Sequence, residues 1–315
     1  MRSSRLSIVN PAKVWVLVDK DNPFLETQCL GIAEAMDFPA HLYRVSVPWG
    51  WKYIPLWLVP DIILRVHSTP KPLMSPWPSL VICGGKVGLK IGSYLRKKHN
   101  SFTVAFGSTS SSFHKVVIES CQQGEKRNKI MTLGPLPRIH PEGLLQARQS
   151  VYRKMDHLPK PRIGLFLEGQ EPLLPLIDFL KNFYKKTPFS LMIYEEKLSE
   201  ERRKCLAMGF KEIPHLLWDG QGEDPYLGFL AHSETIIVSN SSSLMMAEAS
   251  SVGKPLFIYP ISSLDLYVQA LIQKGYAALL TKESSLFSRI VLPPLQETQR
   301  VAQIVKEAYT EALNS

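Results

Sequence analysis

Three serines and a glutamate follow an apolar segment of the sequence in an order that could bind a nucleotide. Ser241, Ser242 and Ser243 come after the apolar run 235–239, where a strand is expected to end and a helix to begin. A helix N-terminus exposes unpaired N–H groups and roughly half a positive charge, so it attracts phosphate. Glu248 follows Ser241 by seven residues, which places it on the same helical face, about 10 Å along the axis. The spacing predicts a nucleoside diphosphate site, with phosphate at the serines and the ribose diol on the carboxylate.

The same four residues also have an ordinary structural interpretation. Serine is a common residue at the N-cap of a helix, and a glutamate within a helix is usually solvated. Spacing alone therefore leaves both interpretations open for this segment.

The elements that must position these residues alternate between strands and helices. Short β-branched or leucine-rich runs are followed by amphipathic runs, which is typical of a parallel, doubly wound sheet. The alternation restarts after a proline-punctuated segment near residue 160. We therefore expect an α/β fold of two Rossmann-like doubly wound domains facing a cleft, because such sheets bind ligands beyond the carboxyl ends of their strands. Strands are expected at 13–20, 40–47, 78–85, 102–108, 114–120, 162–170, 189–196, 212–220, 235–240 and 256–260.

The domain boundaries follow from the same alternation. We expect a first domain over residues 1–158 and a second over 159–295. Residues 296–315 are predicted to form a long amphipathic helix, and by analogy with related folds this helix packs back on the N-terminal domain.

Charge and composition narrow the classes of partner. The net charge of +9 suggests an anionic partner, which is phosphate, an acidic membrane surface or nucleic acid. We expect no nucleic acid, because the sequence has no zinc finger, aromatic RNA-reading motif or long basic arm. The four cysteines lie far apart, without a C-x-x-C pair, which indicates a reducing compartment. The N-terminal segment lacks the apolar core of a secretory signal. A cytoplasmic location, peripheral on a membrane, is expected.

Several segments carry a resemblance to a known family. The segment 233–260, SETIIVSNSSSLMMAEASSVGKPLFIYP, resembles the donor site of type-B glycosyltransferases, especially the lipid-linked N-acetylglucosaminyltransferase of peptidoglycan synthesis. More specifically, the chain is similar to bacterial-type members of the mitochondrial fission (elongated-mitochondria) family. The resemblance covers most of the chain, from about Val14 to about Leu280. It rests on the segments 26–36, 76–88, 132–148 and, most specifically, 216–255.

This resemblance implies roles for particular residues. The donor nucleotide would bind the C-terminal half and the acceptor the N-terminal half. Glu248 would hold ribose, and Ser241, Ser242 and Ser243 would face the diphosphate together with the loop of Gly169. Other residues of the expected cleft and phosphate site are Gly84, Gly85, Lys86, Gln28, Asp224 and Tyr226.

Each of these further assignments has its own basis. Gly84 and Gly85 would let backbone approach the cleft, although an ordinary strand-to-helix turn explains them equally well. Lys86 would neutralise phosphate or lie on the surface. The Asp224-Pro225-Tyr226 segment stands where the family has Asn-Pro-Tyr.

Other positions depart from the family pattern. Glu195 and Glu196 replace a loop that tends to carry serine and paired arginine, and two carboxylates would repel a diphosphate. Glu168-Gly169 replaces the usual Gly-Gly. Either the donor differs or catalysis is lost.

The expected site also needs a catalytic base. Glycosyl transfer to a hydroxyl needs a base near the acceptor, and the resemblance places it in the first loop, where Asp21 is preferred over Asp19 and Glu26. The alternative is turn chemistry, since Asp-Asn-Pro favours turns. No metal is expected, because type-B enzymes of this kind need none, and no cofactor is expected beside the nucleotide-sugar substrate.

A cluster of aromatic residues suggests contact with a membrane. Trp49, Trp51 and Trp57 lie within the segment 47–61, and amphipathic rings suit a membrane interface. A lipid-linked acceptor would make such a surface useful, and the positive net charge would favour anionic lipid. The alternative is that these rings pack in the core. The longest apolar region, 53–66, contains two prolines, an aspartate and an arginine, which exclude a spanning helix.

Three functions remain open from the sequence. The preferred one is a glycosyltransferase-like protein, inverting and metal-independent, that transfers sugar from a nucleotide-sugar to an unknown, lipid-linked acceptor. The second is a non-catalytic, membrane-associated adaptor that binds a protein partner, as the plant relatives do with a dynamin-like GTPase. The third is a nucleoside-diphosphate-sugar epimerase, which would need paired acid and base carboxylates in the cleft.

Overall fold

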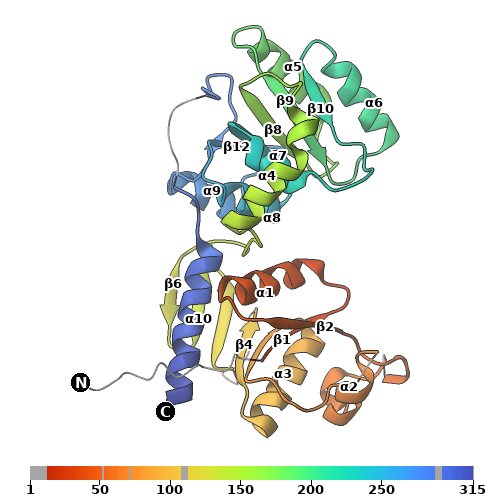
Figure 1. The fold of residues 1–315 in the computed structure, drawn as a ribbon, viewed down its shortest axis with the longest axis vertical. Coiled ribbons are helices and arrows are strands. Elements are labelled where there is room, and N and C mark those ends of the chain that lie inside the picture. Colours follow the sequence, from red (N-terminus) through yellow and green to blue (C-terminus); the bar gives the residue numbers. More distant parts are fainter. Residues whose placement is uncertain (1–12, 52, 71, 108–112, 288–292, 315) are drawn as a thin grey trace, which may run out of the picture. The chain divides into compact units, whose positions relative to one another are not determined.

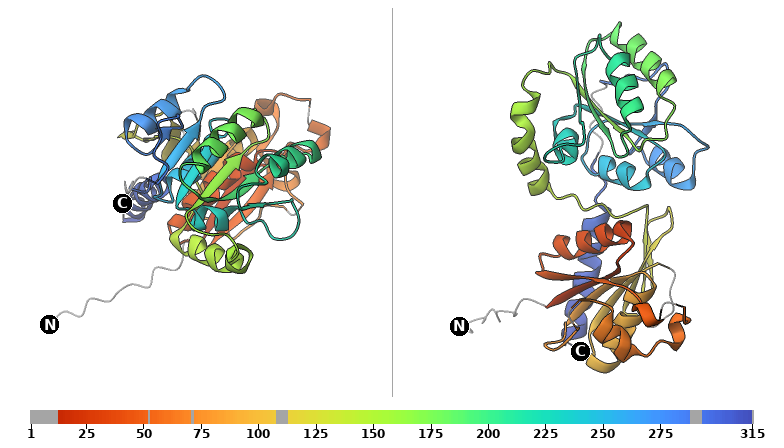
Figure 2. Two further views of the ribbon diagram at one scale, coloured as in Figure 1. Left: turned by 90° about the horizontal axis from the view of Figure 1, so that it is seen from above. Right: turned by 90° about the vertical axis from the view of Figure 1, so that its right-hand side faces the viewer.

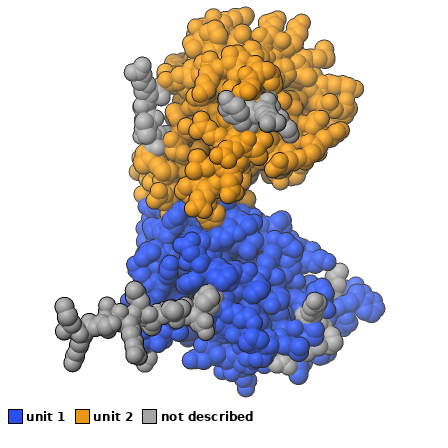
Figure 3. All heavy atoms as spheres, viewed as in Figure 1, with its two compact units in different colours: residues 1–138, 297–315 blue, residues 139–296 orange. Residues whose placement is uncertain are grey.

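The chain folds into two compact units, each built around its own sheet. The computed structural model describes residues 13–51, 53–70, 72–107, 113–287 and 293–314. The first unit combines Met1–Arg138 with Glu297–Ser315, and the second is Ile139–Gln296; Figure 3 colours them blue and orange.

The sheet of the first unit is parallel except at one edge. Its strand order is β2-β1-β3-β4-β5-β7-β6, and among the described strands only β6 runs antiparallel, as a hairpin with β7 (Figure 1). The strand order reverses between the neighbouring strands β1 and β3, because the chain moves from β1 to β2 on one side and then to β3 on the other. A ligand site is therefore expected at the carboxyl ends of β1 and β3. The strands are β1 (Val14–Asp19), β2 (Ala40–Val45), β3 (Leu80–Gly84), β4 (Phe102–Phe106), β5 (Lys115–Glu119), β6 (Gly124–Lys126) and β7 (Lys129–Thr132).

Helices cover both faces of this sheet because successive residues of a strand point to opposite faces. Val16 packs with residues of α1 (Pro23–Ala35) and α10 (Glu297–Asn314), whereas the next residue, Leu17, packs with α2 (Asp61–His67) and α3 (Lys86–His99). Figure 2 shows the two layers of helices with the sheet between them. Both faces of the central strands β1, β3 and β4 are therefore buried.

The C-terminal helix α10 is tied into the first unit by buried polar contacts. The carboxylate of Glu297 accepts a hydrogen bond from the backbone of Leu133 (3.0 Å) and pairs with Arg300 (3.0 Å). The hydroxyl of Thr298 donates to the carbonyl of Pro137 (2.8 Å). The chain thus returns to the first unit after completing the second.

The sheet of the second unit is entirely parallel among the strands that the structure describes. Its order is β10-β9-β8-β11-β12-β13, the doubly wound order in which the winding reverses between β8 and β11. Ligands bind this kind of sheet at the carboxyl ends of the two strands at the reversal. The strands are β8 (Arg162–Leu167), β9 (Ser190–Glu195), β10 (His215–Leu217), β11 (Thr235–Ser239), β12 (Leu256–Tyr259) and β13 (Ala278–Leu279).

Helices again cover both faces of the second sheet. α5 (Leu173–Tyr184) and α6 (Glu200–Gly209) pack on one face through a shared apolar cluster. α7 (Tyr226–His232) and α8 (Ser243–Ser250) contact the strands from the other face. The short helix α9 (Leu266–Gln273) follows β12.

The boundary between the units lies near residue 138, and not at 158 as expected from the sequence. The helix α4 (Pro141–Met155) packs against α7 of the second unit. In addition, the buried guanidinium of Arg162 donates to the carbonyls of Met155 (3.1 Å) and Leu158 (2.9 and 3.0 Å). These contacts assign α4 to the second unit, although the prolines that follow it suggest a linker.

Candidate functional site

The serine segment lies between β11 and α8, at the carboxyl edge of the second sheet. Helix α8 begins at Ser243, and the hydroxyl of Ser242 caps it by accepting from the backbone N–H of Met245 (3.3 Å). Ser241 precedes the helix, so its seven-residue spacing from Glu248 is not a helical spacing. Glu248 instead lies five residues after Ser243, about 7.5 Å along the helix axis from its first turn.

Glu248 is a partly buried carboxylate that one tyrosine holds in place. The hydroxyl of Tyr226 donates to its Oε2 (2.5 Å), while Oε1 accepts no hydrogen bond from any residue that the structure describes. Burial, together with the nearby charge of Glu196, raises the pKa of Glu248 to about 7, against the lowering effect of the Tyr226 hydrogen bond. One oxygen of this oriented carboxylate is therefore available for a hydroxyl of a ligand.

Aromatic rings hold Tyr226 in its position. Its ring lies 4.9 Å from that of Tyr194 and 5.3 Å from that of Phe166, between ring centroids. Tyr194 in turn stacks on Trp218, with 5.1 Å between centroids and 6° between planes. Asp224 accepts from the hydroxyl of Tyr194 (3.3 Å) and the backbone N–H of Tyr226 (2.8 Å). Tyr226, the first residue of α7, therefore holds Glu248, and Asp224, two residues earlier, holds Tyr226.

A residue that the sequence analysis missed, Glu171, occupies the centre of this edge. It follows β8 in the loop before α5, and only 1% of it is exposed. Its carboxylate accepts from the backbone N–H groups of Glu168 (2.8 Å) and Gly169 (2.9 Å) and from the hydroxyl of Ser241 (2.9 Å). The backbone of Gly169 has a φ of 106°, a conformation that favours glycine. The loop that contains Gly169 therefore already binds an anion, and so does Ser241. That anion is the carboxylate of Glu171, a residue of the same chain.

Glu195 and Arg202 form the other charged part of this edge. The expectation that Glu195 faces a ligand is wrong, because Glu195 is 1% exposed, whereas Glu196 is exposed. Arg202 of α6 pairs with Glu195 and lies 3.4 Å from Oε2 of Glu171. Burial raises the pKa of Glu195, although Arg202 opposes this. The guanidinium therefore links two buried carboxylates.

In the first unit, an aspartate fills the place where phosphate was expected. Gly85 and Lys86 begin α3, and the carboxylate of Asp19 accepts from the backbone N–H groups of Lys86 (2.8 Å), Val87 (3.0 Å) and Gly88 (3.0 Å). A Cβ on Gly85 would lie 2.3 Å from the carboxyl carbon of Asp19, and φ of Gly85 is 80°. The glycine therefore makes room for Asp19. Gly84, the last residue of β3, packs against Leu25.

The structure also places the remaining residues of the first loop. Asp21 is exposed in the turn between β1 and α1, next to Asn22, which caps α1. Asp19 and Asp21 have the Asp-x-Asp spacing, but the carboxylate of Asp19 is engaged by α3. Gln28 is buried, and its side-chain oxygen accepts from the backbone of Leu136 (3.0 Å). The described contact of Gln28 thus ties α1 to the loop after β7.

Comparison with known proteins identifies the family. The sequence profile of the family described as mitochondrial fission ELM1 matches residues 25–309, which is most of the chain. The chain belongs to the mitochondrial fission ELM1 family. The mitochondrial fission protein ELM1 of Arabidopsis thaliana is 22% identical over 190 residues, 56% of this chain. The chain matches less than half the length of its curated relatives, 44% of the Arabidopsis protein and 27% of another.

Solved structures similar to this ELM1-family chain establish its fold class. The UDP-GlcNAc 2-epimerase of Neisseria meningitidis, solved with UDP-GlcNAc, aligns with a TM-score of 0.54 at 13% identity, over 96% of this chain and 91% of that one. The glycosyltransferase SnogD of Streptomyces nogalater aligns with a TM-score of 0.52 at 11% identity, over 95% of each chain. The ELM1-family chain therefore has the two Rossmann-like domains of the glycosyltransferase type-B fold, as the sequence analysis expected.

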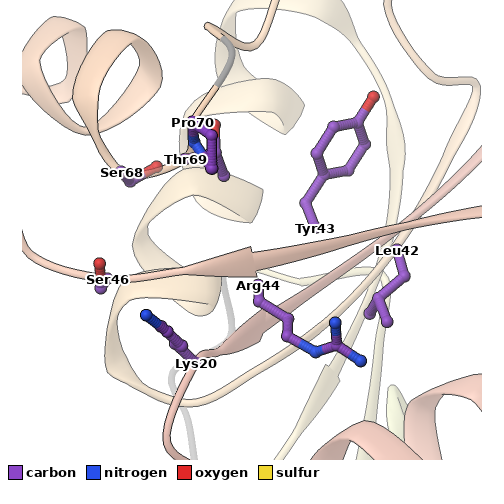
Figure 4. A pocket seen from close by; sticks show the side chains of 8 residues that line it. All are labelled: Lys20, Leu42, Tyr43, Arg44, Ser46, Ser68, Thr69 and Pro70. Atoms are coloured by element: carbon purple, nitrogen blue, oxygen red, sulfur yellow. The ribbon is translucent and has the colours of Figure 1, made fainter.

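The first unit of this ELM1-family chain has a cavity that the sequence did not indicate. The cavity has a volume of about 730 Å³ at the carboxyl ends of β1 and β2. Figure 4 shows Tyr43 on one side of β2, with Leu42 and Arg44 on the other. Both oxygens of Glu26 hold Arg44 (2.6 and 2.7 Å). Basic and hydroxyl groups line much of this cavity, which comprises Lys20, Leu42, Tyr43, Arg44, Ser46, Ser68, Thr69 and Pro70.

The predicted membrane-contact residues fall on two short turns before α2. Trp49 of the 3-10 turn Trp49–Trp51 is 89% exposed, and Trp57 of the turn Leu56–Leu58 is 78% exposed. Trp51 differs, because it is partly buried against the core that contains Trp15. The surrounding segment also exposes Tyr53, Ile54, Leu58 and Ile62. Within the described residues, no helix has the length and apolarity to cross a membrane.

Proposed function

We propose that this ELM1-family protein binds a nucleotide-sugar at the carboxyl edge of the second sheet and transfers the sugar to an acceptor. The observation that carries the proposal is Glu248. Tyr226 orients this carboxylate through Oε2, so that Oε1 of Glu248 can accept from a ribose hydroxyl. It follows the first turn of α8, whose N-terminus lies beside the reversal between β8 and β11, where Rossmann-like sheets bind nucleotides. The type-B fold and the UDP-GlcNAc bound by a structural neighbour support the same ligand class.

The first unit would supply the acceptor side of the reaction. Its cavity lies next to the first loop, since Lys20 lines the cavity and Asp21 follows Lys20 in the chain. Asp21 is exposed and is our proposed base, because transfer to a hydroxyl needs a proton acceptor outside the folded core. Lys20 in this lining would suit an acceptor that carries phosphate, as a lipid-linked sugar does.

Calorimetric titration with UDP, GDP, ADP, CDP and dTDP tests the nucleotide proposal. We expect saturable binding of one of them, weakened about 10- to 100-fold in Glu248→Ala, because hydrogen bonds to a charged group contribute about 1.5–3 kcal/mol. The matched control is Glu212→Ala, an exposed glutamate that precedes β10 and so lies at the opposite edge of the sheet. If the folded protein binds none of the five, or if both variants bind equally well, the assignment of Glu248 is wrong.

We also propose that the exposed segment around Trp49 and Trp57 contacts a membrane that carries the acceptor. Flotation with vesicles of phosphatidylcholine and phosphatidylglycerol measures this contact. Trp49→Ser/Trp57→Ser is expected to reduce the bound fraction at least ~10-fold, because each large apolar side chain contributes about 1.5–3 kcal/mol on burial. Met208→Ser, which removes an exposed apolar side chain from α6 of the second unit, is the control. Equal flotation of both variants would show that the segment around Trp49 and Trp57 is not the membrane-contact surface.

The exposed aromatic segment also fits the second candidate, a non-catalytic membrane-associated adaptor. An adaptor needs a surface for a membrane or a partner but no nucleotide. The calorimetric result separates the two candidates: vesicle binding without nucleotide binding would favour the adaptor.

A further inference from the structure

Glu171 lies where a nucleotide phosphate would be expected in the second unit. The loop after β8 is the first crossover loop of a doubly wound sheet, and in such sheets its backbone N–H groups bind phosphate. Here the N–H groups of Glu168 and Gly169 both point to the carboxylate of Glu171, at 2.8 and 2.9 Å. The loop is therefore folded around an anion that the chain itself provides.

The donors on the neighbouring strand are engaged in the same way. Ser239 ends β11, and its hydroxyl donates to Oε1 of Glu171, as does that of Ser241 at 2.9 Å. Arg202 completes the set: its Nη1 donates to the backbone carbonyl of Glu171 (2.8 Å), and its Nη2 lies 3.4 Å from Oε2. Two backbone groups, two hydroxyls and one guanidinium thus surround a single carboxylate that is 1% exposed.

The ionisation of Glu171 agrees with this arrangement. Burial alone would raise its pKa, but hydrogen bonds from Ser239 and from backbone N–H groups outweigh burial and lower the pKa below the ordinary value. The carboxylate is therefore charged at neutral pH. A phosphate brought to the same donors would meet both a filled site and a like charge.

The first unit contains a similar arrangement. The carboxylate of Asp19 accepts from three successive N–H groups at the start of α3, beside the strand reversal of that sheet. In both units, therefore, an acidic side chain of the protein occupies donors that Rossmann-like folds commonly use for phosphate. Glu171 differs in that serine hydroxyls and an arginine are also committed to it.

We propose that Glu171 is a built-in competitor for the phosphates of a nucleotide, and that a nucleoside diphosphate gains full affinity only when this carboxylate leaves its donors. The choice of a nucleotide as the ligand rests on the proposed function. Glu171 thereby determines specificity: with it in place, the site favours the nucleoside end of the ligand, and the diphosphate adds little to binding.

Two substitutions of Glu171 test this proposal against a matched control. Glu171→Gln keeps the shape of the side chain and removes its charge, whereas Glu171→Ala vacates the donors. Glu168→Gln removes the same charge from the same loop, but the Glu168 side chain pairs loosely with Lys197 (4.0 Å) and accepts from none of the described donors around Glu171. Circular dichroism establishes that each variant is folded.

Two measurements are made on each protein. Calorimetry compares uridine with UDP, or the corresponding pair if the nucleotide screen selects another base. Thermal unfolding is followed with and without inorganic pyrophosphate, which probes the donors without any nucleoside. In the wild type we expect UDP to bind within a few-fold of uridine, and pyrophosphate not to raise the melting temperature. In Glu171→Ala we expect UDP to bind ~10-fold tighter or more, with uridine unchanged, because the vacated donors can bind a charged group. In Glu171→Gln, which loses the like charge but keeps an oxygen on the donors, we expect a smaller gain for UDP and again no change for uridine.

The outcomes separate this inference from the proposed function. Stabilisation of Glu171→Ala by pyrophosphate, without nucleotide binding by any protein, would support the competitor and contradict the nucleotide-sugar proposal. UDP binding that depends on Glu248 but is equal in the wild type and both Glu171 variants would overturn the competitor alone. An equal gain in Glu168→Gln would reduce the effect to general charge and also overturn it. Folded variants that bind neither probe would contradict both.

Discussion

Replacing Arg202 by alanine is expected to lower the free energy of unfolding by about 3 kcal/mol. Arg202 is the cation that pairs with Glu195 and Glu171, and the side chains of both carboxylates are 0% exposed. Removing one partner of a buried ion pair leaves an uncompensated charge, which typically costs about 3–5 kcal/mol. We place the effect at the low end because Glu171 keeps its other donors and Arg202 itself is partly exposed. Urea unfolding at neutral pH measures it.

A double variant identifies the cause of that loss. In Glu195→Gln/Arg202→Ala the buried charge of Glu195 is absent, so the loss should be smaller than the sum of the two single losses by at least about 1 kcal/mol. The neighbouring Arg203→Ala, which removes an exposed pair with Glu200, should change stability by less than about 0.5 kcal/mol. Additive losses would show that Arg202 acts only through packing of its apolar stem.

Glu248→Gln is expected to make the protein more stable than the wild type at pH 8 but not near pH 5. The pKa of Glu248 is about 7 in the folded protein, against an ordinary value of 4.5. Between pH 4.5 and pH 7, Glu248 is therefore protonated in the folded protein and ionised in the unfolded protein. The stability that Glu248 contributes is fully present below pH 4.5 and is lost as the pH rises through 7. The glutamine variant lacks this loss and can still accept from Tyr226. The gain at pH 8 should approach roughly 3 kcal/mol, since one pKa unit corresponds to about 1.4 kcal/mol.

The measurement is urea unfolding of wild type and variant from pH 5 to pH 8.5. Glu212→Gln, at an exposed position, provides the control and should follow the wild type at every pH. If the Glu248→Gln and wild-type curves run parallel across this range, Glu248 titrates as an ordinary surface carboxylate. That result would also weaken its assignment as an oriented ribose ligand.

Most strands of the two sheets could be predicted from the sequence because buried parallel strands are continuous apolar runs, but β6, β7 and β13 were not expected. The run 162–170 gave β8 and the run 235–240 gave β11, within a few residues at the ends. Elements without such a signal were missed. β6 consists of Gly-Glu-Lys and exists only because β7 pairs with it, and α7 is a seven-residue helix too short to show a period.

The residues of the candidate site also differ in whether a local sequence pattern indicates them. Ser242 as an N-cap and Glu248 in the following helix depend on local sequence, so a pattern could indicate them. Glu171 and Arg202 act through contacts with residues that are distant in the chain, and no local pattern marks such partners. Likewise, Gly85 was predicted to admit a ligand, whereas the space beside it contains Asp19, which lies 66 residues earlier. A sequence shows that a position has room, but not which group fills it.

The return of α10 to the first unit has a consequence for synthesis on the ribosome. Val301, Val305 and Tyr309 belong to the same apolar cluster as Val16 of β1 and Ile32 of α1. Until residues 297–314 have emerged from the exit tunnel, one face of the first sheet lacks part of its cover, although the seven strands β1–β7 have long been made. The second unit is contiguous in the chain and can fold while translation continues. The domain that is translated first is therefore the one completed last, and its nascent form exposes an apolar surface that chaperones recognise.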